Sequence, residues 1–551
     1  MTFDFDYLVI GSGFGGSVSA HRLTEKGYTV GVLEAGRRWR AEDFPRTTWR
    51  VRKFLWAPVL RCFGIMRMTF FRDAFVLSGA GVGGGSLVYA NTLLVPPESF
   101  FEDAQWRDIQ DWTKALSPHY EVALKMLGAV ESPHLGETDL LLEETAREMG
   151  REDTFKRATV GIYFGEGPGR KHPDPFFGGR GPERAGCNLC AGCMVGCRFH
   201  AKNTLDKNYL WLAEQGGAEV IPSTTVTDLR PLPGGGFEVF THRSGSPLLR
   251  LGKRRYTARH VVLSAGAIGS TRLLLACRER GSLTGLSQQL GNFVRTNSES
   301  ILGVTAKARG VNYARGLAIS AGFYPDDDTH IETVRYNRGS DMLSTLSTVM
   351  TDDGPAWRRL IQSVWIMAKQ PLQTLRNSVP FGWARRTIIL LVMQPVRSHM
   401  RFVFKRRWWA PWSRTLQTRN DGDERVKATI PIGNEVATRI AKRVGGQTRS
   451  VLTEVLFNVP TTAHIMGGCA IGSSRERGVV DGHCQVHGVD GLRVIDGSVI
   501  PANLGVNPSL TITALAEHAM AAIPAKAALK LEPKTLTQDP LNKERSEDVS
   551  T

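Results

Sequence analysis

The 551-residue sequence contains no long hydrophobic run. No window reaches the roughly 18 uninterrupted apolar residues that a membrane-spanning helix needs, so a transmembrane protein is not expected. The first residues are acidic rather than basic and lead directly into a strand-like segment, so no secretory signal peptide is expected either. We therefore expect a cytoplasmic protein or one that works at a membrane surface.

Cysteine is also scarce, with eight residues, which is too few for a disulfide scaffold in a chain of this length. Half of them nevertheless fall within eleven residues, at Cys187, Cys190, Cys193 and Cys197. The spacing Cys-x2-Cys-x2-Cys-x3-Cys is that of the iron–sulfur ligands of bacterial ferredoxins, although a ferredoxin run ends in Cys-Pro and its fourth cysteine serves a second cluster. A single run could then hold three irons or recruit a remote thiol. Zinc prefers two separated pairs. Three alternatives stay open: an iron–sulfur cluster, zinc, or four thiols without metal.

Acidic residues are missing from two stretches. Residues 354–420 contain thirteen Lys and Arg and residues 44–72 contain seven, and neither stretch has an Asp or Glu. Six of the twelve tryptophans lie between Trp357 and Trp412. These residues form either a basic amphipathic segment in the headgroup region of an anionic membrane or a pocket lined by aromatic rings with ordinary solvated arginines. Both interpretations favour a lipophilic ligand, and no nucleic-acid-binding motif accompanies the charge.

Glycine, by contrast, is abundant and clustered. Residues 5–10, "FDYLVI", predict a buried parallel strand, and "GSGFGG" follows it directly. Gly11, Gly13 and Gly16 form G-x-G-x-x-G between this strand and a helix-like segment, and Glu34 closes the next strand. This pattern is typical of a dinucleotide-binding βαβ unit. The glycines allow a pyrophosphate to approach the helix N-terminus, and Glu34 can accept hydrogen bonds from a ribose hydroxyl.

The segment "VDGLRVIDGSVIPANLGVNPSLTITALAEHAMAAI" is a second candidate for cofactor binding. A short strand ends at Asp496-Gly497, Asn507 occupies the expected N-cap of a helix, and Pro508 its first position. Because the helix is apolar nearly all round, we expect it to be buried with its positive end facing an anionic ring edge, such as that of a reduced flavin. Upstream, "TTAHIMGGCAIG" places His464 before a Gly-Gly turn, as a candidate catalytic residue.

Together these segments resemble the glucose–methanol–choline (GMC) family of flavoprotein oxidoreductases, and within it most closely the cholesterol oxidases. The resemblance covers nearly all of residues 5–525 and rests on the N-terminal glycines, "GVGGGSLVYAN", "SAGAIGSTRLLL", "HIMGGC" and "DGSVIPANLGVNPSLTITALAEH". It implies FAD rather than NAD. It also implies that His464 takes or orients the substrate hydroxyl proton while hydride leaves for flavin N5, and that Asn507 hydrogen-bonds the substrate oxygen or the flavin edge.

The motifs and the resemblance together predict one set of cofactor-binding residues: Gly11, Gly13, Phe14, Gly16, Glu34, Gly83, Gly85, Ser86, Asn91, Val226, Ala265, Gly266, Asp496, Gly497, Asn507 and Pro508. The chain departs from the family at Ile465, where cholesterol oxidases usually have proline. The acid that those enzymes use to isomerise the steroid double bond has no counterpart in "FGWARRTIILLVMQ", which offers arginines instead. Oxidation without isomerisation is therefore one expectation.

We predict two domains. Residues 1–295 and 460–530 form an α/β, Rossmann-like FAD-binding domain that includes a cysteine-rich loop at 186–203, residues 296–459 form a mainly antiparallel α+β substrate domain, and 531–551 form a disordered tail. The predicted function is FAD-dependent oxidation of the hydroxyl of a sterol, a steroid or a similar lipophilic alcohol, with oxygen or an unknown acceptor. The alternative is a long-chain or terpenoid alcohol dehydrogenase that passes electrons to a partner through an iron–sulfur cluster.

Overall fold

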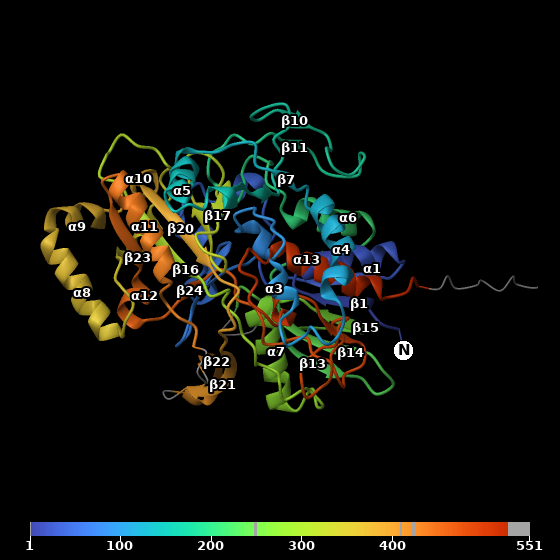
Figure 1. The fold of residues 1–551 in the computed structure, drawn as a ribbon. Coiled ribbons are helices and arrows are strands. Elements are labelled where there is room, and N and C mark those ends of the chain that lie inside the picture. Colours follow the sequence, from blue (N-terminus) through green and yellow to red (C-terminus); the bar gives the residue numbers. More distant parts are fainter. Residues whose placement is uncertain (1, 247–250, 408–409, 421–424, 527–551) are drawn as a thin grey trace, which may run out of the picture.

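The computed structural model describes residues 2–246, 251–407, 410–420 and 425–526, which are arranged around two large sheets (Figure 1). The tail predicted at 531–551 lies outside the described residues. Within the described ranges, no helix combines the length and the apolar character required to cross a membrane.

The first sheet is built on the predicted βαβ unit. Strand β1 (Phe5–Ile10) pairs in parallel with β2 (Val30–Leu33) and with β15 (Arg254–Leu263), and helix α1 (Phe14–Glu25) connects β1 to β2. The sheet has the order β12-β2-β1-β15-β14-β13, with β25 paired to the end of β15. The added strands are β12 (Glu219–Ile221), β13 (Thr224–Pro231), β14 (Phe237–Arg243) and β25 (Leu492–Val494).

Three helices that start far apart in the sequence pack against one another beside this sheet. They are α1, α6 (Tyr209–Gln215) and α13 (Ser509–Ala521). Buried Glu517 of α13 joins all three, because its carboxylate accepts hydrogen bonds from Arg22 Nε at 2.7 Å and from the Tyr209 hydroxyl at 2.6 Å. This arrangement fixes α1 and α13 relative to each other.

The second sheet is antiparallel, with the strand order β19-β23-β16-β20-β18-β17-β8. Helix α11 (Pro431–Arg443) covers one face, where Leu302, Val392 and Ile440 belong to one buried cluster (Figure 1). The fold class predicted from the sequence is confirmed. The strands are β8 (Lys156–Arg157), β16 (Ser300–Thr305), β17 (Ala321–Phe323), β18 (His330–Val334), β19 (Ser347–Val349), β20 (Thr387–Met393) and β23 (Gln447–Val451).

Two elements that precede residue 296 pack with the second sheet. Strand β8 pairs with β17, and helix α5 (Glu137–Glu148) contacts both β17 and α11. Buried Asp139 of α5 accepts a hydrogen bond from Thr333 at 2.7 Å and forms an ion pair with buried Arg335. The domain boundaries at 296 and 460 stay a prediction, and these contacts associate part of the N-terminal segment with the second sheet.

Candidate active site

One cavity of about 940 Å³ connects the two sheets. Ile10 and Leu33, the last residues of β1 and β2, line one end, so the cavity opens at the carboxyl edge of the parallel strands. Open α/β sheets bind their ligands at this edge. At the other end the wall is formed by the second sheet, whose Ile301, Val334 and Ile389 line the cavity. The end of the cavity beside the parallel strands is therefore the expected dinucleotide site, and the cavity continues from there into an apolar chamber.

In the glycine-rich turn after β1, Gly11 is required for close packing and Gly13 leaves space for a ligand. Gly11 has φ +101°, and a Cβ there would lie 2.2 Å from the carbonyl oxygen of Ser264, so the strand packing excludes any side chain. Gly13 lines the cavity immediately before α1, and a Cβ built on it meets nothing within 4 Å. The first N–H groups of α1 have no side-chain cap. The space beside Gly13 is therefore an open anion site at a helix N-terminus, which fits a pyrophosphate.

Glu34 is held rigidly at the end of the second strand. Its carboxylate accepts hydrogen bonds from the Ser12 N–H at 3.0 Å, from the Ser12 hydroxyl at 2.7 Å and from the Gly36 N–H at 2.7 Å. Glu34 is buried and lines the cavity, and a carboxylate has further lone pairs that a ribose hydroxyl can use. Arg67, from β5 (Met66–Phe70), lines the same region near Glu34, although no sequence motif includes it.

Asp496 connects the last strand of the first sheet to helix α7 (Gly266–Arg280). One carboxylate oxygen accepts hydrogen bonds from the Gly266 N–H at 2.9 Å and from the Ser270 hydroxyl, and the other accepts from the Ser498 N–H at 2.8 Å. Burial raises the pKa of Asp496 in spite of these donors. The group lies on the cavity wall, where it can bind polar parts of a dinucleotide.

His464 follows the short strand β24 (Thr461–Thr462). Its Nδ1 lies 3.3 Å from Oε2 of buried Glu299, which also accepts hydrogen bonds from the Thr462 hydroxyl at 2.7 Å and from the Ala463 N–H at 3.0 Å. Nε2 is thus the ring nitrogen left for a ligand in the cavity. Burial lowers the pKa of His464, but the negative charges of Glu299 and Glu332 outweigh it, and the pKa is raised above its ordinary value.

Asn507 lines the cavity just before helix α13. Its side-chain N–H donates to Glu332 Oε2 at 3.2 Å, on strand β18, and the side-chain oxygen has no hydrogen-bonding partner among the described residues. Burial raises the pKa of Glu332 to about 7, against the opposing effects of Asn507 and His464. The helix begins at Ser509 with Pro508 as N-cap, so the predicted N-cap role of Asn507 is wrong by one residue.

Comparison with known proteins identifies the family. Residues 411–516 match the family model described as GMC oxidoreductase, and residues 9–50 match that of an NAD(P)-binding Rossmann-like domain. A cholesterol oxidase of Acinetobacter baumannii is 46% identical over 98% of this chain and 97% of its own length. A cholesterol oxidase of Mycobacterium tuberculosis is 48% identical over 96% of this chain and 93% of its own length. The chain belongs to the GMC oxidoreductases.

The solved structure of a formate oxidase from Aspergillus oryzae shares the fold of this GMC oxidoreductase, with a TM-score of 0.60 and 15% identity over 95% of this chain and 98% of that chain. The protein is an FAD-dependent oxidoreductase that acts on CH–OH donors. The open space at Gly13 and the carboxylates of Glu34 and Asp496 fit the pyrophosphate and the hydroxyl groups of that cofactor.

The structure places most of the predicted cofactor-binding residues on the wall of this cavity. Gly16, Gly83, Ser86 and Asn91 are not on it. Gly16 packs on the Gly11 carbonyl, and the Ser86 hydroxyl donates to the Gly83 carbonyl at 2.7 Å. The residues that line the cavity are Gly11, Gly13, Phe14, Glu34, Gly85, Val226, Ala265, Gly266, Asp496, Gly497, Asn507 and Pro508.

Two carboxyl groups of the GMC site belong to no motif. Glu299 immediately precedes β16 and Glu332 lies within β18, and both are fully buried. For Glu332 the available signal was an acidic residue within a strand segment, because a buried carboxyl needs a polar partner. Glu299 stands in a polar run before its strand and gives no such signal. Those partners, His464 and Asn507, lie more than 160 residues away in the sequence, so only the fold brings them together.

The four cysteines of the predicted cluster line a second cavity, of about 480 Å³. Among the described residues, no three His, Cys, Asp or Glu side chains converge on a point where one metal ion could bind. The structure therefore gives no support to the zinc alternative.

Proposed function

We propose that this GMC oxidoreductase oxidises the hydroxyl group of a sterol or steroid to a carbonyl. The observation that carries the proposal is the continuity of the cavity, which runs from the glycine-rich turn past His464 and Asn507 into an apolar chamber. A sugar would need many polar partners there. Two relatives that are 46% and 48% identical over nearly the whole chain are cholesterol oxidases, so a long-chain or terpenoid alcohol has less support. The chamber wall includes Ile301, Val334, Tyr336, Leu343, Leu346, Trp383, Ile389 and Leu391.

In this proposal His464 and Asn507 act on the substrate oxygen. Bound FAD supplies the acceptor for the hydride that leaves the carbinol carbon. His464 Nε2 accepts the hydroxyl proton, and Glu299 stabilises the resulting imidazolium from the Nδ1 side. Asn507 binds the substrate oxygen, while Glu332 holds its amide in place from strand β18.

Glu332 is also a candidate for the acid that isomerises a steroid double bond, a residue that the sequence motifs do not identify. It is a buried carboxyl with a pKa of about 7, next to Asn507, so it can exchange a proton near neutral pH. We therefore propose Glu332 as the group that would transfer a proton if a sterol with a non-conjugated double bond is the substrate.

The test is an anaerobic titration of the purified flavoprotein with a 3-hydroxysteroid. We expect the visible absorbance of the flavin to bleach as the alcohol is oxidised, and a matched long-chain alcohol to bleach it much less. Failure of every hydroxysteroid to bleach the flavin would refute the substrate class. The product distinguishes the two chemistries, because isomerisation gives a conjugated enone, and Glu332→Gln should then release the non-conjugated ketone.

We further propose that helices α8 (Ala356–Lys369) and α9 (Pro371–Ser378) dock on an anionic lipid surface. Helix α8 buries Arg359 and Ser363 and turns its apolar residues outward. Arg359 donates to Thr351 Oγ1 at 3.0 Å and to Asn458 Oδ1 at 2.9 Å, so polar contacts attach the helix to the protein. The exposed apolar residues of α8, α9 and the segment after them are Trp357 (63% exposed), Leu360, Ile361, Val364, Trp365, Leu372 (83%), Leu375, Val379 and Phe381 (75%).

The position and charge of this surface favour a membrane. Figure 1 shows α8 and α9 at the outer margin of the second sheet, away from the core. Lys369 lies over the Trp365 ring at 3.6 Å, and the stretch 354–420 lacks acids. Trp383, on the cavity wall, follows exposed Phe381 by two residues in the sequence. Tryptophan and basic residues together suit the headgroup region.

Vesicle sedimentation tests the membrane proposal. We expect the protein to bind vesicles that contain phosphatidylserine, more weakly at high salt. Ile361→Glu combined with Trp365→Glu should weaken binding by roughly 10-fold or more, since each apolar side chain contributes about 1.5–3 kcal/mol when buried. Leu140→Glu, at an exposed apolar position on α5, is the control and should bind like the wild type. Equal binding by the double variant would refute the proposal.

A further inference from the structure

We propose that Cys187, Cys190, Cys193 and Cys197 together hold one four-iron, four-sulfide cluster. All four line the same 480 Å³ cavity. In two-cluster ferredoxins the fourth cysteine of this spacing serves the other cluster, whereas here Cys197 shares the cavity with the other three. The four cysteines elsewhere in the chain are Cys62, Cys277, Cys469 and Cys484, and none of them lines it.

The shape of the site favours a cluster over a single ion. One zinc ion needs ligands that converge on a point within about 2.3 Å of each sulfur. No such convergence exists among the described residues. A four-iron cluster has its four ligands around a body that itself occupies space, and the 480 Å³ cavity that all four cysteines line provides that space.

Hydrogen-bond donors surround the thiols. The Leu189 N–H donates to Cys187 Sγ at 3.4 Å. The Ala191 N–H is not among these donors, because it donates to the Gly316 carbonyl at 2.8 Å. The other donors are the N–H groups of Gly192 toward Cys190, of Ala318 toward Cys193, and of Phe199, Ala201 and Lys202 toward Cys197.

Asn91 is an independent indication of a ligand here. This residue does not line the flavin cavity, is fully buried and lies against the Cys193 thiol. Neither its amide nitrogen nor its amide oxygen has a nitrogen or oxygen partner among the described residues. An amide N–H next to a ligating sulfur is one of the contacts that tune a cluster.

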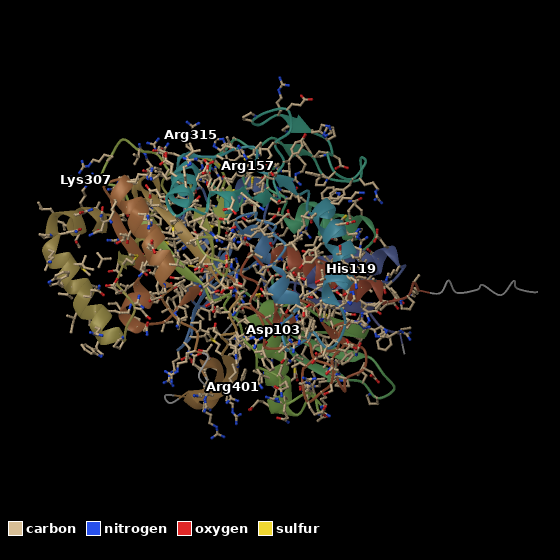
Figure 2. All side chains as sticks on the ribbon, viewed as in Figure 1. Asp103, His119, Arg157, Lys307, Arg315 and Arg401 are labelled. Carbon is tan, nitrogen blue, oxygen red and sulfur yellow. The ribbon has the colours of Figure 1, made fainter. Side chains whose placement is uncertain are left out.

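Cations offset the negative charge that four thiolates carry. Buried Lys202 reaches the site and donates to the Cys193 carbonyl at 2.8 Å. Buried Lys207 and Arg184 act electrostatically on Cys197. Exposed Arg315 lines the outer part of the cavity, and Figure 2 shows it at the surface above helix α5.

The site is adjacent to the flavin cavity. Met194 lines the 940 Å³ cavity, while its neighbours Cys193 and Val195 line the cysteine cavity. Lys202 connects the two, because it also donates to the Tyr89 carbonyl at 2.9 Å and Tyr89 lines the flavin cavity. At this point a single residue of backbone separates the two cavities, so a cluster held by these cysteines would lie beside the cofactor cavity.

Metal analysis of the whole protein, purified without oxygen or chelators, tests the proposal. We expect about four irons and about four acid-labile sulfides per chain. We also expect a paramagnetic signal after chemical reduction that free flavin does not give. Protein that lacks iron should acquire it on anaerobic incubation with ferrous iron and sulfide. Zinc in place of iron, iron without sulfide, or no uptake during this incubation would overturn the assignment.

Substitution of single cysteines tests whether the iron is bound by the cysteines of this cavity. Cys190→Ala should lose most of the iron and sulfide while it retains FAD, whose absorbance reports that the fold is intact. Cys187→Ser is a second variant in case Cys190→Ala does not fold. Cys484→Ser, at a buried cysteine outside the cavity, is the control and should keep its iron. Full iron content in a folded Cys190→Ala or Cys187→Ser variant would overturn the proposal.

Discussion

His464→Ala is expected to lower kcat/KM for the alcohol by roughly 10²–10⁴-fold, the usual contribution of a positioned general base, while FAD stays bound. The imidazole lines the cavity, and its Nδ1 lies 3.3 Å from the buried carboxylate of Glu299. Alanine removes the proton acceptor and leaves the cofactor contacts in place. The measurement is the rate of anaerobic flavin reduction by the substrate.

The matched control is His119→Ala. His119 lies on α4 (Trp112–Met126), does not line the cavity, and is labelled in Figure 2. This variant should reduce its flavin at the wild-type rate. If His464→Ala also reduces its flavin at the wild-type rate, proton transfer at this residue is not part of the reaction.

The pH profile of Glu299→Gln tests the same assignment without removing the base. The charge of Glu299 raises the pKa of His464, so the neutral form of the imidazole, which accepts the proton, is lost as the pH falls through that raised value. Glutamine keeps an oxygen near Nδ1 but removes the charge. The pKa of His464 should therefore fall, and the acid limb of kcat/KM should move to lower pH. An acid limb that stays in place or moves upward would contradict the assignment.

The parts of the site that could be predicted from sequence are those encoded by local geometry. Gly11 and Gly13 are recognisable because a turn between a strand and a helix imposes glycine within a few residues. His464 is recognisable by the Gly-Gly turn that follows it. Glu299 and Glu332 are not, because their roles depend on strands of a second sheet that fold against distant segments. The N-cap assignment of Asn507 is wrong by one residue. Its hydrogen bond to Glu332 was not predictable either, because the two residues lie 175 positions apart in the sequence.

Helix α8 shows a second limit of sequence patterns. The spacing of apolar residues around Trp365 predicts an amphipathic helix, and periodicity cannot tell which face is buried. The structure buries Arg359, whose partners Thr351 and Asn458 lie on separate segments, and exposes Trp357. The interpretation of the tryptophans as pocket-lining residues is therefore wrong for Trp357 and Trp365 and right for Trp383.

Gly13→Val should give a folded protein that binds FAD at least about 100-fold more weakly, a loss of about 3 kcal/mol. A Cβ at Gly13 meets no protein atom within 4 Å, and its φ of −73° is accessible to valine, so the apoprotein has no reason to unfold. The added side chain would occupy the space at the start of α1 that the pyrophosphate needs. The measurement is FAD titration of the apoprotein, read by fluorescence quenching and by the melting temperature.

Substitutions at two further glycines distinguish a loss of FAD binding from a loss of folding stability. Gly310→Val is the control, because a Cβ there also meets nothing within 4 Å but lies outside the cavity, and FAD affinity should be unchanged. Gly11→Ala should instead destabilise the apoprotein itself, since its Cβ would lie 2.2 Å from the Ser264 carbonyl oxygen. In the wild type, excess FAD raises the melting temperature by mass action, and Gly13→Val should require about 100 times more FAD for the same rise. An unchanged FAD affinity in Gly13→Val would place the pyrophosphate elsewhere in the cavity.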